Sequence, residues 1–470
     1  MENLMKRRIL VLLLALATPV FAEITLPHIL SNHAVLQRDQ PIRIWGHAAA
    51  GETITVRFHD QSLTTTADAA GAWQVTLKPE HAGGPYTLTV SGSRSSTVTR
   101  TDLLIGDVWV ASGQSNMEFP LRGFPVTPNS YDYKAISHAN RPLIRFLHEA
   151  HAASPTRLDD ANADWTPCTP ETAEPISAVA YYFAVALQAK ENIPIGIIST
   201  SWGGTPALAW VSAEGIQASR LLEEDADRMP SGGRRTHGSH HPSWLFNGMI
   251  APFTQTAIKG VIWYQGENDA KNFPRDYRQI FPAVITSWRK AWGEGNFPFL
   301  FVQLPGWENG LGWGWIRDAQ RRTLSLSHTA MVGTLDLGVD RLLHPPDKKD
   351  VGERLALAAR ETVYGESIEG MPPLFVRATV EGNSIRAYFA HAEGLTSRGA
   401  ALANFEVAGA DGDFFPATAR IELAGGKNTV IASSPQVTAP RFIRYGWSPW
   451  VSTYLWNSAG LSMAAFSSKP

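Results

Sequence analysis

The sequence predicts an α/β protein: a three-layer α/β/α sandwich built on a parallel sheet, with an all-β module on each side of it. Three observations predict this arrangement. The chain has 470 residues, which is too long for one ordinary hydrophobic core. Both ends alternate apolar and polar residues with period two, as half-buried strands do. Between them, short continuous apolar runs alternate with longer helical patterns, which favours parallel strands covered on both faces.

The composition supports a folded chain and excludes some partners. Hydrophobic residues make up 44% and charged residues 18%, which argues against intrinsic disorder. Lys plus Arg (41) nearly balance Asp plus Glu (43), and no long basic run is present, so nucleic acid is not an expected partner. Cys168 is the single cysteine, so an intramolecular disulfide is impossible. The sequence carries no indication of the oligomeric state.

The first 22 residues have the pattern of a signal peptide. Lys6, Arg7 and Arg8 precede an apolar stretch, and Ala22 ends a small and apolar segment that suits cleavage. The apolar stretch is shorter than the ~20 residues that a bilayer span requires, so no stable membrane anchor is expected. We therefore expect a secreted or periplasmic protein whose mature chain begins near Glu23.

The N-terminal module is expected over residues 23–100. Its apolar residues alternate in the runs 53–58, 73–77 and 86–90, and turn residues separate these runs. This pattern is typical of a small β-sandwich. A similar alternation returns after Pro372 and Pro373, so a second β module is expected over residues 366–470.

The central domain is expected over residues 101–365. Helical patterns are present at 177–190, 277–292 and 350–362, and the candidate strands are residues 108–111, 195–200, 260–264, 299–303 and 331–335. Strands that alternate with helices imply right-handed crossovers and a flavodoxin-like parallel sheet.

The residues that follow these strands are unusually polar. Ligands of an open α/β sheet bind beyond the carboxyl ends of its strands, so these segments are the ones to inspect. Residues 112–117 follow the first strand, residues 201–205 the second and residues 265–269 the third, and Asp340 and His344 lie in the loop after the fifth. We expect all four segments to meet along one edge of the sheet.

Ser115 is the candidate nucleophile. A serine at a strand-to-helix turn exposes its hydroxyl, and the adjacent N–H groups favour a developing oxyanion. The same position also suits a serine that only caps a helix. Met117 occupies the last place of what would be a G-x-S-x-G motif, which disfavours an ordinary α/β-hydrolase.

Other polar groups complete a candidate site for acyl transfer. Gly203 and Gly204 would let the backbone approach a substrate and present an N–H, and the side-chain amides of Asn268 and Gln265 could supply a further donor. His344 is the candidate base, because acyl transfer needs a group that takes the serine proton and returns it to the leaving alcohol.

A second group of histidines does not indicate a metal site. His237, His240 and His241 lie in a loop rich in Gly, Ser and Arg, and no acidic or thiol residue stands beside them. We expect no metal there.

The chain resembles the sialate O-acetylesterase family, a branch of the SGNH hydrolases. The resemblance is carried by the stretches "IGDVWVASGQSNMEFPL", "SWGGTPALAWVS", "LFNGMIAPF", "GVIWYQGEND" and "HPPDKKDVGERLALAAR", and it covers nearly all of the mature chain. It implies an SGNH-type core flanked by β modules. It also implies hydrolysis of acetyl esters without a cofactor, on an O-acetylated sugar that is either a small molecule or an oligosaccharide.

The resemblance also assigns roles to single residues. The family's serine falls on Ser115, its glycine on Gly204 (or Gly203 if the loop is shifted), its third motif on residues 266–269 and its histidine on His344. The chain departs from the superfamily at one place, because Leu342 and Arg341 stand where an acid commonly precedes the histidine.

Three interpretations of the missing acid stay open. Glu267 could reach across from the third-strand loop, Asp340 could fold back within the histidine's own loop, or a backbone carbonyl could orient a Ser-His dyad. Glu267 is slightly favoured, because its loop looks like the one that supplies the acid in some related sugar acetylesterases.

The substrate also has alternatives. Sialic acid carries a carboxylate, so a cationic group such as Arg317 or Arg341 near the site would favour it, whereas a long neutral groove would favour acetylated xylan or another plant polysaccharide. A non-catalytic carbohydrate-binding protein and a metal-dependent deacetylase are the remaining hypotheses.

Overall fold

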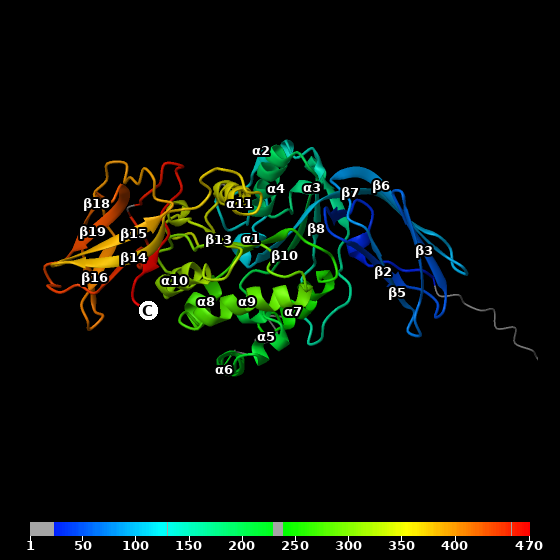
Figure 1. Ribbon diagram of the computed structural model, residues 1–470, viewed down its shortest axis with the longest axis horizontal. Helices are drawn as coiled ribbons and strands as arrows, with labels where there is room; N and C mark the ends of the chain where they lie inside the picture. Colours follow the sequence, from blue (N-terminus) through cyan, green and yellow to red (C-terminus); the bar gives the residue numbers. More distant parts are fainter. Residues whose placement is uncertain (1–22, 129, 229–237, 453) are drawn as a thin grey trace, which may run out of the picture.

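The computed structural model describes residues 23–128, 130–228, 238–452 and 454–470. The predicted signal peptide, residues 1–22, lies outside the described residues. An N-terminal group of strands, a central α/β region and a C-terminal group of strands follow one another along the length of the molecule (Figure 1). None of the described helices is long and apolar enough to cross a membrane.

The N-terminal strands form the predicted β module. Ile54, Val56 and Phe58 of one strand are fully buried and alternate with more exposed residues, as the period-two pattern predicts. One sheet has the order β4-β3-β6-β7, β1 pairs with β7, and β2 pairs separately with β5. The strands are β1 (Val35–Gln37), β2 (Ile42–His47), β3 (Thr53–Phe58), β4 (Gln61–Thr66), β5 (Ala72–Leu77), β6 (Gly83–Gly92) and β7 (Val98–Gly113).

Strand β7 belongs to two sheets. Its first part pairs antiparallel with β6, and its last part, from Asp107 to Gly113, pairs parallel with β10 (Ile195–Ser201) of the central sheet. The boundary that we expected between residues 100 and 101 therefore falls inside a continuous strand. Because no linker separates the two sheets, the N-terminal strands are fixed directly to the strand that leads to Ser115.

The central sheet has the order β13-β12-β11-β7-β10-β8-β9. All neighbouring strands are parallel except β9, which pairs antiparallel at the edge. The further strands are β8 (Arg141–His148), β9 (Trp165–Cys168), β11 (Gly260–Tyr264), β12 (Phe299–Val302) and β13 (Thr329–Val332). The five predicted strands are all present, and their order, β10-β7-β11-β12-β13, is the flavodoxin-like one. The pair β8 and β9 was not predicted and extends the sheet beyond β10.

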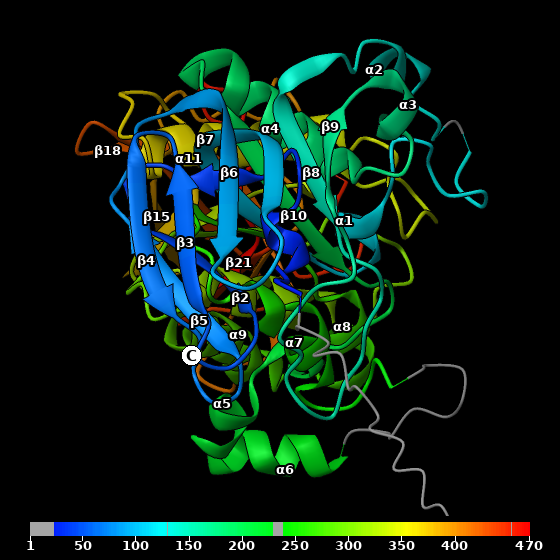
Figure 2. The same ribbon diagram turned by 90° about the vertical axis from the view of Figure 1, so that its right-hand side faces the viewer.

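Helices cover both faces of the central sheet and complete the predicted three-layer sandwich. Helices α4 (Ala178–Glu191) and α11 (Lys349–Thr362) pack against each other on one face, and α9 (Tyr277–Trp292) and α10 (Trp313–Thr323) pack together on the other (Figures 1 and 2). The shorter helices are α1 (Ser115–Glu118), α2 (Tyr133–Ser137), α3 (Pro170–Ala173), α5 (Ala213–Gln217), α6 (Arg220–Arg228), α7 (Trp244–Met249) and α8 (Glu267–Asn272). The described residues also form the short 3-10 helices η1 (His28–Leu30), η2 (Ala207–Trp210), η4 (Ala251–Phe253) and η5 (Leu335–Leu337).

The C-terminal strands form two antiparallel sheets, β14-β15-β19-β18 and β17-β16-β20-β21. Buried side chains from both sheets, such as Ile385 and Val430 from one and Val407 and Ile443 from the other, share one apolar core. The second predicted β module is thereby confirmed. Its strands are β14 (Leu374–Glu381), β15 (Ser384–Ala390), β16 (Phe405–Ala408), β17 (Phe414–Pro416), β18 (Thr418–Ala424), β19 (Lys427–Ser433), β20 (Phe442–Tyr445) and β21 (Phe466–Ser467).

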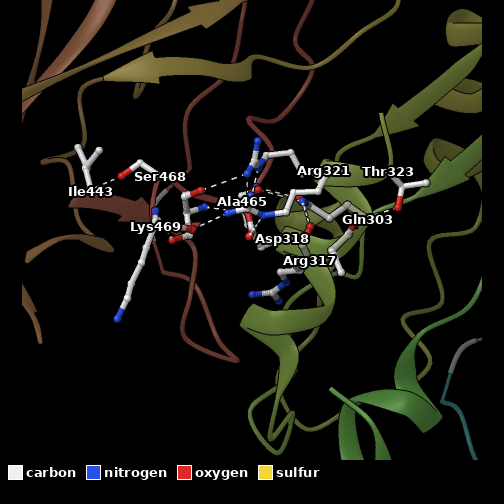
Figure 3. Close-up of polar contacts among 12 residues, drawn as sticks. Gln303, Arg317, Asp318, Arg321, Thr323, Ile443, Ala465, Ser468 and Lys469 are labelled. Atoms are coloured by element: carbon white, nitrogen blue, oxygen red, sulfur yellow. Dashed lines mark hydrogen bonds and ion pairs between the residues drawn. The ribbon is translucent and has the colours of Figure 1, made fainter. Parts of the chain in front are cut away.

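Polar contacts join the C-terminal sheets to the central region (Figure 3). Gln303, which follows β12, donates to the carbonyl of Ala465 at 3.0 Å and accepts from its N–H at 2.7 Å. The Arg317 guanidinium is fully buried and donates to five backbone carbonyls, those of Leu304, Pro305, Gly446, Ser448 and Pro449. Arg317 is therefore committed to the contact between the two parts of the chain and is not available to a substrate.

Candidate active site

Ser115 and His344 lie in direct contact at the carboxyl edge of the central sheet. The Nε2 atom of His344 is 2.8 Å from the Oγ atom of Ser115, although the two residues are 229 positions apart in the sequence. Ser115 opens helix α1 directly after β7, and His344 lies in the loop between η5 and α11. The hydroxyl and the imidazole that were predicted separately are thus within hydrogen-bonding distance.

A close approach of β7 and β11 positions the turn that carries Ser115. Gly113 has a φ of 137°, and a Cβ atom there would lie 2.1 Å from the carbonyl oxygen of Tyr264. Only glycine fits at this point. The side-chain oxygen of Gln114 then accepts from the N–H groups of Gly266 (3.4 Å) and Asn268 (3.2 Å). These contacts tie the loop after β7 to the loop after β11.

The loop after β10 brings a second glycine pair beside Ser115. The Gly203 N–H donates to the Glu118 carboxylate at 2.7 Å. Gly204 has a φ of +75°, and its carbonyl accepts from the side-chain amide of Asn268 at 2.7 Å. Among the described residues, no protein group accepts a hydrogen bond from the Gly204 N–H. Gly204 is therefore the better of the two candidate oxyanion donors, and Asn268 holds it in place.

Gln265 does not suit the role that the sequence suggested. Its side chain is fully buried, and its amide nitrogen donates to the carbonyl of Thr205 and to the carboxylate of Asp269. Both amide hydrogens are thus used inside the protein. We correct the expectation that Gln265 supplies an oxyanion donor, because this side chain ties the loop after β10 to α8.

His344 is held as a neutral imidazole. Burial, together with the positive charge of Lys348, lowers the pKa of His344 from 6.5 to about 4, and the negative charge of Glu118 acts in the opposite direction. The ring also makes an edge contact with Phe124, at 5.3 Å between centroids. At neutral pH the imidazole can therefore accept a proton.

The pH dependence of hydrolysis should report this shift. We expect kcat/KM for 4-nitrophenyl acetate to stay near its plateau from about pH 7 down to about pH 5, and to fall about tenfold per pH unit below about pH 4, as the free imidazole becomes protonated. Steady-state rates in buffers of constant ionic strength measure this limb. An acidic limb centred near pH 6.5, the ordinary value for histidine, would contradict a buried neutral imidazole.

Neither candidate acid contacts the imidazole in this structure. The Glu267 carboxylate accepts instead from the side-chain amide of Asn116 at 2.5 Å. Asp340 is exposed and lies 3.7 Å from the guanidinium of Arg341. Among the described residues, Ser115 is the one hydrogen-bond partner of the His344 ring. The identity of an orienting acid therefore stays a prediction.

A buried network adjoins the Ser115–His344 pair through the neighbouring residues Asn116 and Leu343. The Lys348 ammonium group donates to the side-chain oxygen of Asn116 at 2.6 Å, and the Asn116 amide nitrogen donates to Glu267 and, at 3.1 Å, to the carbonyl of Leu343. Lys348 is 2% exposed, and burial lowers its pKa to about 7. The network thus links the residue after Ser115 to the residue before His344.

Lys348 was not predicted as a site residue, because a lysine before a helix is usually solvated. It also missed Glu118, whose carboxylate accepts from His151 at 2.8 Å and from Gly203. The spacing of Ser115 and Glu118, three positions apart on one helix, could have indicated that both side chains face the same site. His151 in turn stacks on Trp202, with ring centroids 4.3 Å apart.

Arg341 and His241, which the sequence also singled out, contact neighbouring side chains. Arg341 is on the His344 loop, mostly exposed, and lies 3.4 Å from the carboxylate of Glu308. His241 stacks on Trp244, and His237 lies outside the described residues.

Comparison with known proteins decides the family. A family model described as "Carbohydrate esterase, sialic acid-specific acetylesterase" matches residues 105–361, which is more than half of the chain. The chain belongs to this family of carbohydrate esterases. Membership agrees with the resemblance found in the sequence, and it makes the protein a carbohydrate acetylesterase.

Relatives in this carbohydrate esterase family span most of the chain. A sialate O-acetylesterase of Rattus norvegicus is 31% identical over 407 residues, covering 72% of this chain and 73% of the relative. The human sialate O-acetylesterase is 30% identical, covering 72% and 70%. The crystal structure of a carbohydrate acetylesterase from Xanthomonas citri superposes with a TM-score of 0.85 at 36% identity, and covers 95% of this chain and 99% of that one.

Proposed function

We propose that this esterase removes acetyl groups from sugar hydroxyls through an acetyl-enzyme on Ser115, with His344 as the general base. The observation that carries this proposal is the 2.8 Å contact between the His344 Nε2 and the Ser115 Oγ, next to an imidazole kept neutral by burial.

The proposed reaction has two steps. His344 takes the proton of the Ser115 hydroxyl as the serine oxygen attacks the acetyl carbonyl, and the same proton then passes to the sugar oxygen, which leaves as an alcohol. In the second step His344 takes a proton from water, the hydroxide attacks the acetyl-serine, and the proton returns to Ser115 as acetic acid leaves and then ionises in the solvent.

The oxyanion would be held by the N–H groups of Ser115 and Gly204. Asn268 has one amide hydrogen on the Gly204 carbonyl and a second that can point to the substrate. We propose that these three donors stabilise the tetrahedral intermediate, since removal of one such donor commonly costs about 10²–10³ in kcat.

In place of a triad acid in contact with the imidazole, we propose that the network of Glu267, Asn116 and Lys348 positions the pair. Asn116 follows the nucleophile in the chain and accepts from Lys348, while its amide donates to the carbonyl before His344. Glu267 keeps a role in this scheme, acting through Asn116 and not on the ring. Asp340 is exposed and lies beside Arg341, so this scheme gives it no role.

Two substrate classes are supported by different observations. O-acetylated sialic acid is favoured by the names of the mammalian relatives. An O-acetylated plant polysaccharide such as xylan is favoured by the burial of Arg317, which leaves one of the two expected carboxylate partners unavailable. We propose the sialic acid ester as the first candidate and the polysaccharide ester as the second.

Acetate release from a matched panel tests the proposal. The panel contains O-acetylated sialic acids, acetylated xylooligosaccharides and 4-nitrophenyl acetate, each incubated with the wild-type protein and with a Ser115→Ala variant. Preference for the sialic acid esters supports the first candidate, and preference for the xylooligosaccharides replaces it by the second. No release from any substrate would overturn the proposed esterase.

We also propose that the protein is exported, as the predicted signal peptide implies. The buried Cys168 is compatible with an oxidising compartment, because burial raises the pKa of its thiol to about 12 and so suppresses the reactive thiolate.

A further inference from the structure

A cavity of about 400 Å³ lies where the central region meets the C-terminal sheets. We call it the interdomain pocket and define it by Arg275, Arg278 and Trp315 from the central region and by Arg444, Trp447 and Lys469 from the C-terminal part. Its volume falls within the range of small-molecule sites, and it is distinct from the Ser115 site, none of whose residues line it.

Positive charge is concentrated in this pocket. Among the described side chains, no carboxylate lies within ion-pair distance of Arg275, Arg278 or Lys469. The charge of Arg444, in contrast, is balanced by Glu406, whose carboxylate accepts two hydrogen bonds from it at 2.8 and 3.0 Å. Asp318 and Pro470, the last residue, also line the pocket with their carboxylates, and that of Asp318 is shared by Arg321 and Arg322. Figure 3 shows the Lys469 side chain pointing away from this Asp318 cluster. Since the whole chain carries a net charge of −2, this local excess of cations is a property of the pocket.

Aromatic rings hold two of the guanidinium groups in place. The Arg275 guanidinium lies over the Trp315 ring at 4.9 Å, and the Arg444 guanidinium lies over Trp447 at 4.8 Å. Trp315 and Trp447 meet edge to face at 5.0 Å, and Trp315 remains 42% exposed. Of these two arginines, Arg275 has no carboxylate partner among the described residues, and its stacking on Trp315 fixes the direction of its N–H donors, which suits the two oxygens of a carboxylate.

The pocket is connected to the proposed active site by one short helix. Asn268, beside Gly204, lies in the first turn of α8 (Glu267–Asn272), and Arg275 follows the end of that helix. Seven residues span at most about 25 Å even when fully extended, and a helical path is shorter. A glycan of a few sugars could therefore reach from one site to the other.

We propose that the interdomain pocket binds a carboxylated sugar, with the carboxylate held by Arg275 and Arg278 and the sugar ring packed against Trp315. The exposed aromatic edge favours a sugar over a simple inorganic anion, and the unpaired guanidinium groups favour a carboxylated sugar over a neutral one. The site extends beyond the proposed esterase, because binding there does not require Ser115 or His344.

Calorimetric titration of the full chain tests this proposal. The probes are trigalacturonic acid and its methyl ester, which has the same rings without the negative charges. We expect the acid to bind to the wild-type protein, the ester to bind at least about tenfold more weakly, and an Arg275→Gln/Arg278→Gln variant to lose at least about tenfold in affinity for the acid. Trp315→Ala should weaken the binding of the acid as well.

A matched control separates local binding from general charge effects. The Arg43→Gln/Arg57→Gln variant loses the same charge from exposed positions on the N-terminal module and should keep wild-type affinity. The proposal is overturned if the acid does not bind at millimolar concentration, if the ester binds equally well, or if the Arg275/Arg278 variant keeps wild-type affinity. Hydrolysis of 4-nitrophenyl acetate, expected to be unchanged in both double variants, reports separately on the proposed esterase.

Discussion

Replacement of Ser115 by alanine is expected to lower kcat for 4-nitrophenyl acetate by about three orders of magnitude or more. The variant has no oxygen within reach of the His344 imidazole, so the acetyl-enzyme cannot form and only the binding and oxyanion contacts remain. Rates of nitrophenol release at saturating substrate measure the effect, and mass spectrometry of the stopped reaction should show acetylation of the wild-type protein alone.

Ser112→Ala provides a matched control in the same segment. Ser112 lies on β7 three residues before Ser115, and its buried hydroxyl has no hydrogen-bond partner among the described residues. Removing an unpaired buried hydroxyl should leave both folding and turnover close to wild type. If Ser115→Ala kept most of its activity while Ser112→Ala lost it, the nucleophile would be wrongly assigned.

The general architecture could be predicted because burial dictates the residue pattern of each element. Strands buried on both faces read as continuous apolar runs, so β11 was predicted at its observed bounds, and helix α9 was found in the same way from its helical period. The site followed from topology, since the ends of parallel strands share one edge. That rule alone brought Ser115 and His344 together before any contact was known.

What could not be predicted depends on long-range pairing. Strand β8 contains the charged Arg145, which is unusual for a strand inside a sheet. Two of its guanidinium nitrogens donate to the carbonyl of Pro142 and to the carboxylate of Asp102. Arg317 was considered as a partner for a substrate carboxylate, whereas the structure surrounds it with five carbonyls from two parts of the chain. No local pattern in a single sequence encodes such partners.

Lys348 could not be predicted for the same reason. Its replacement by methionine should have a large effect on both stability and turnover. Methionine removes the only cation of the described residues that donates to Asn116, and it leaves the Glu267 carboxylate buried without an opposite charge. Removing one partner of a buried charged pair typically costs about 3–5 kcal/mol. Lys348 acts on Glu267 through Asn116 and, with a pKa of about 7, is only partly charged at neutral pH, so we expect the free energy of unfolding to fall by at most that amount. Denaturant titration at neutral pH measures it, and Lys349→Met, at the adjacent exposed position, should change it little.

The Lys348→Met variant also tests whether the network positions the catalytic pair. Loss of alignment between Ser115 and His344 should lower kcat by about 10²-fold, because small displacements of reacting groups have effects of that size. Lys348 lowers the pKa of His344, so the acidic limb of kcat/KM should move to higher pH in the variant. Adding Glu267→Gln removes the uncompensated charge and should restore much of the lost stability without restoring the pH profile. If Lys348 only stabilised the fold, the acidic limb would stay at its wild-type position in both variants, since a change in global stability leaves the charge beside the imidazole as it was.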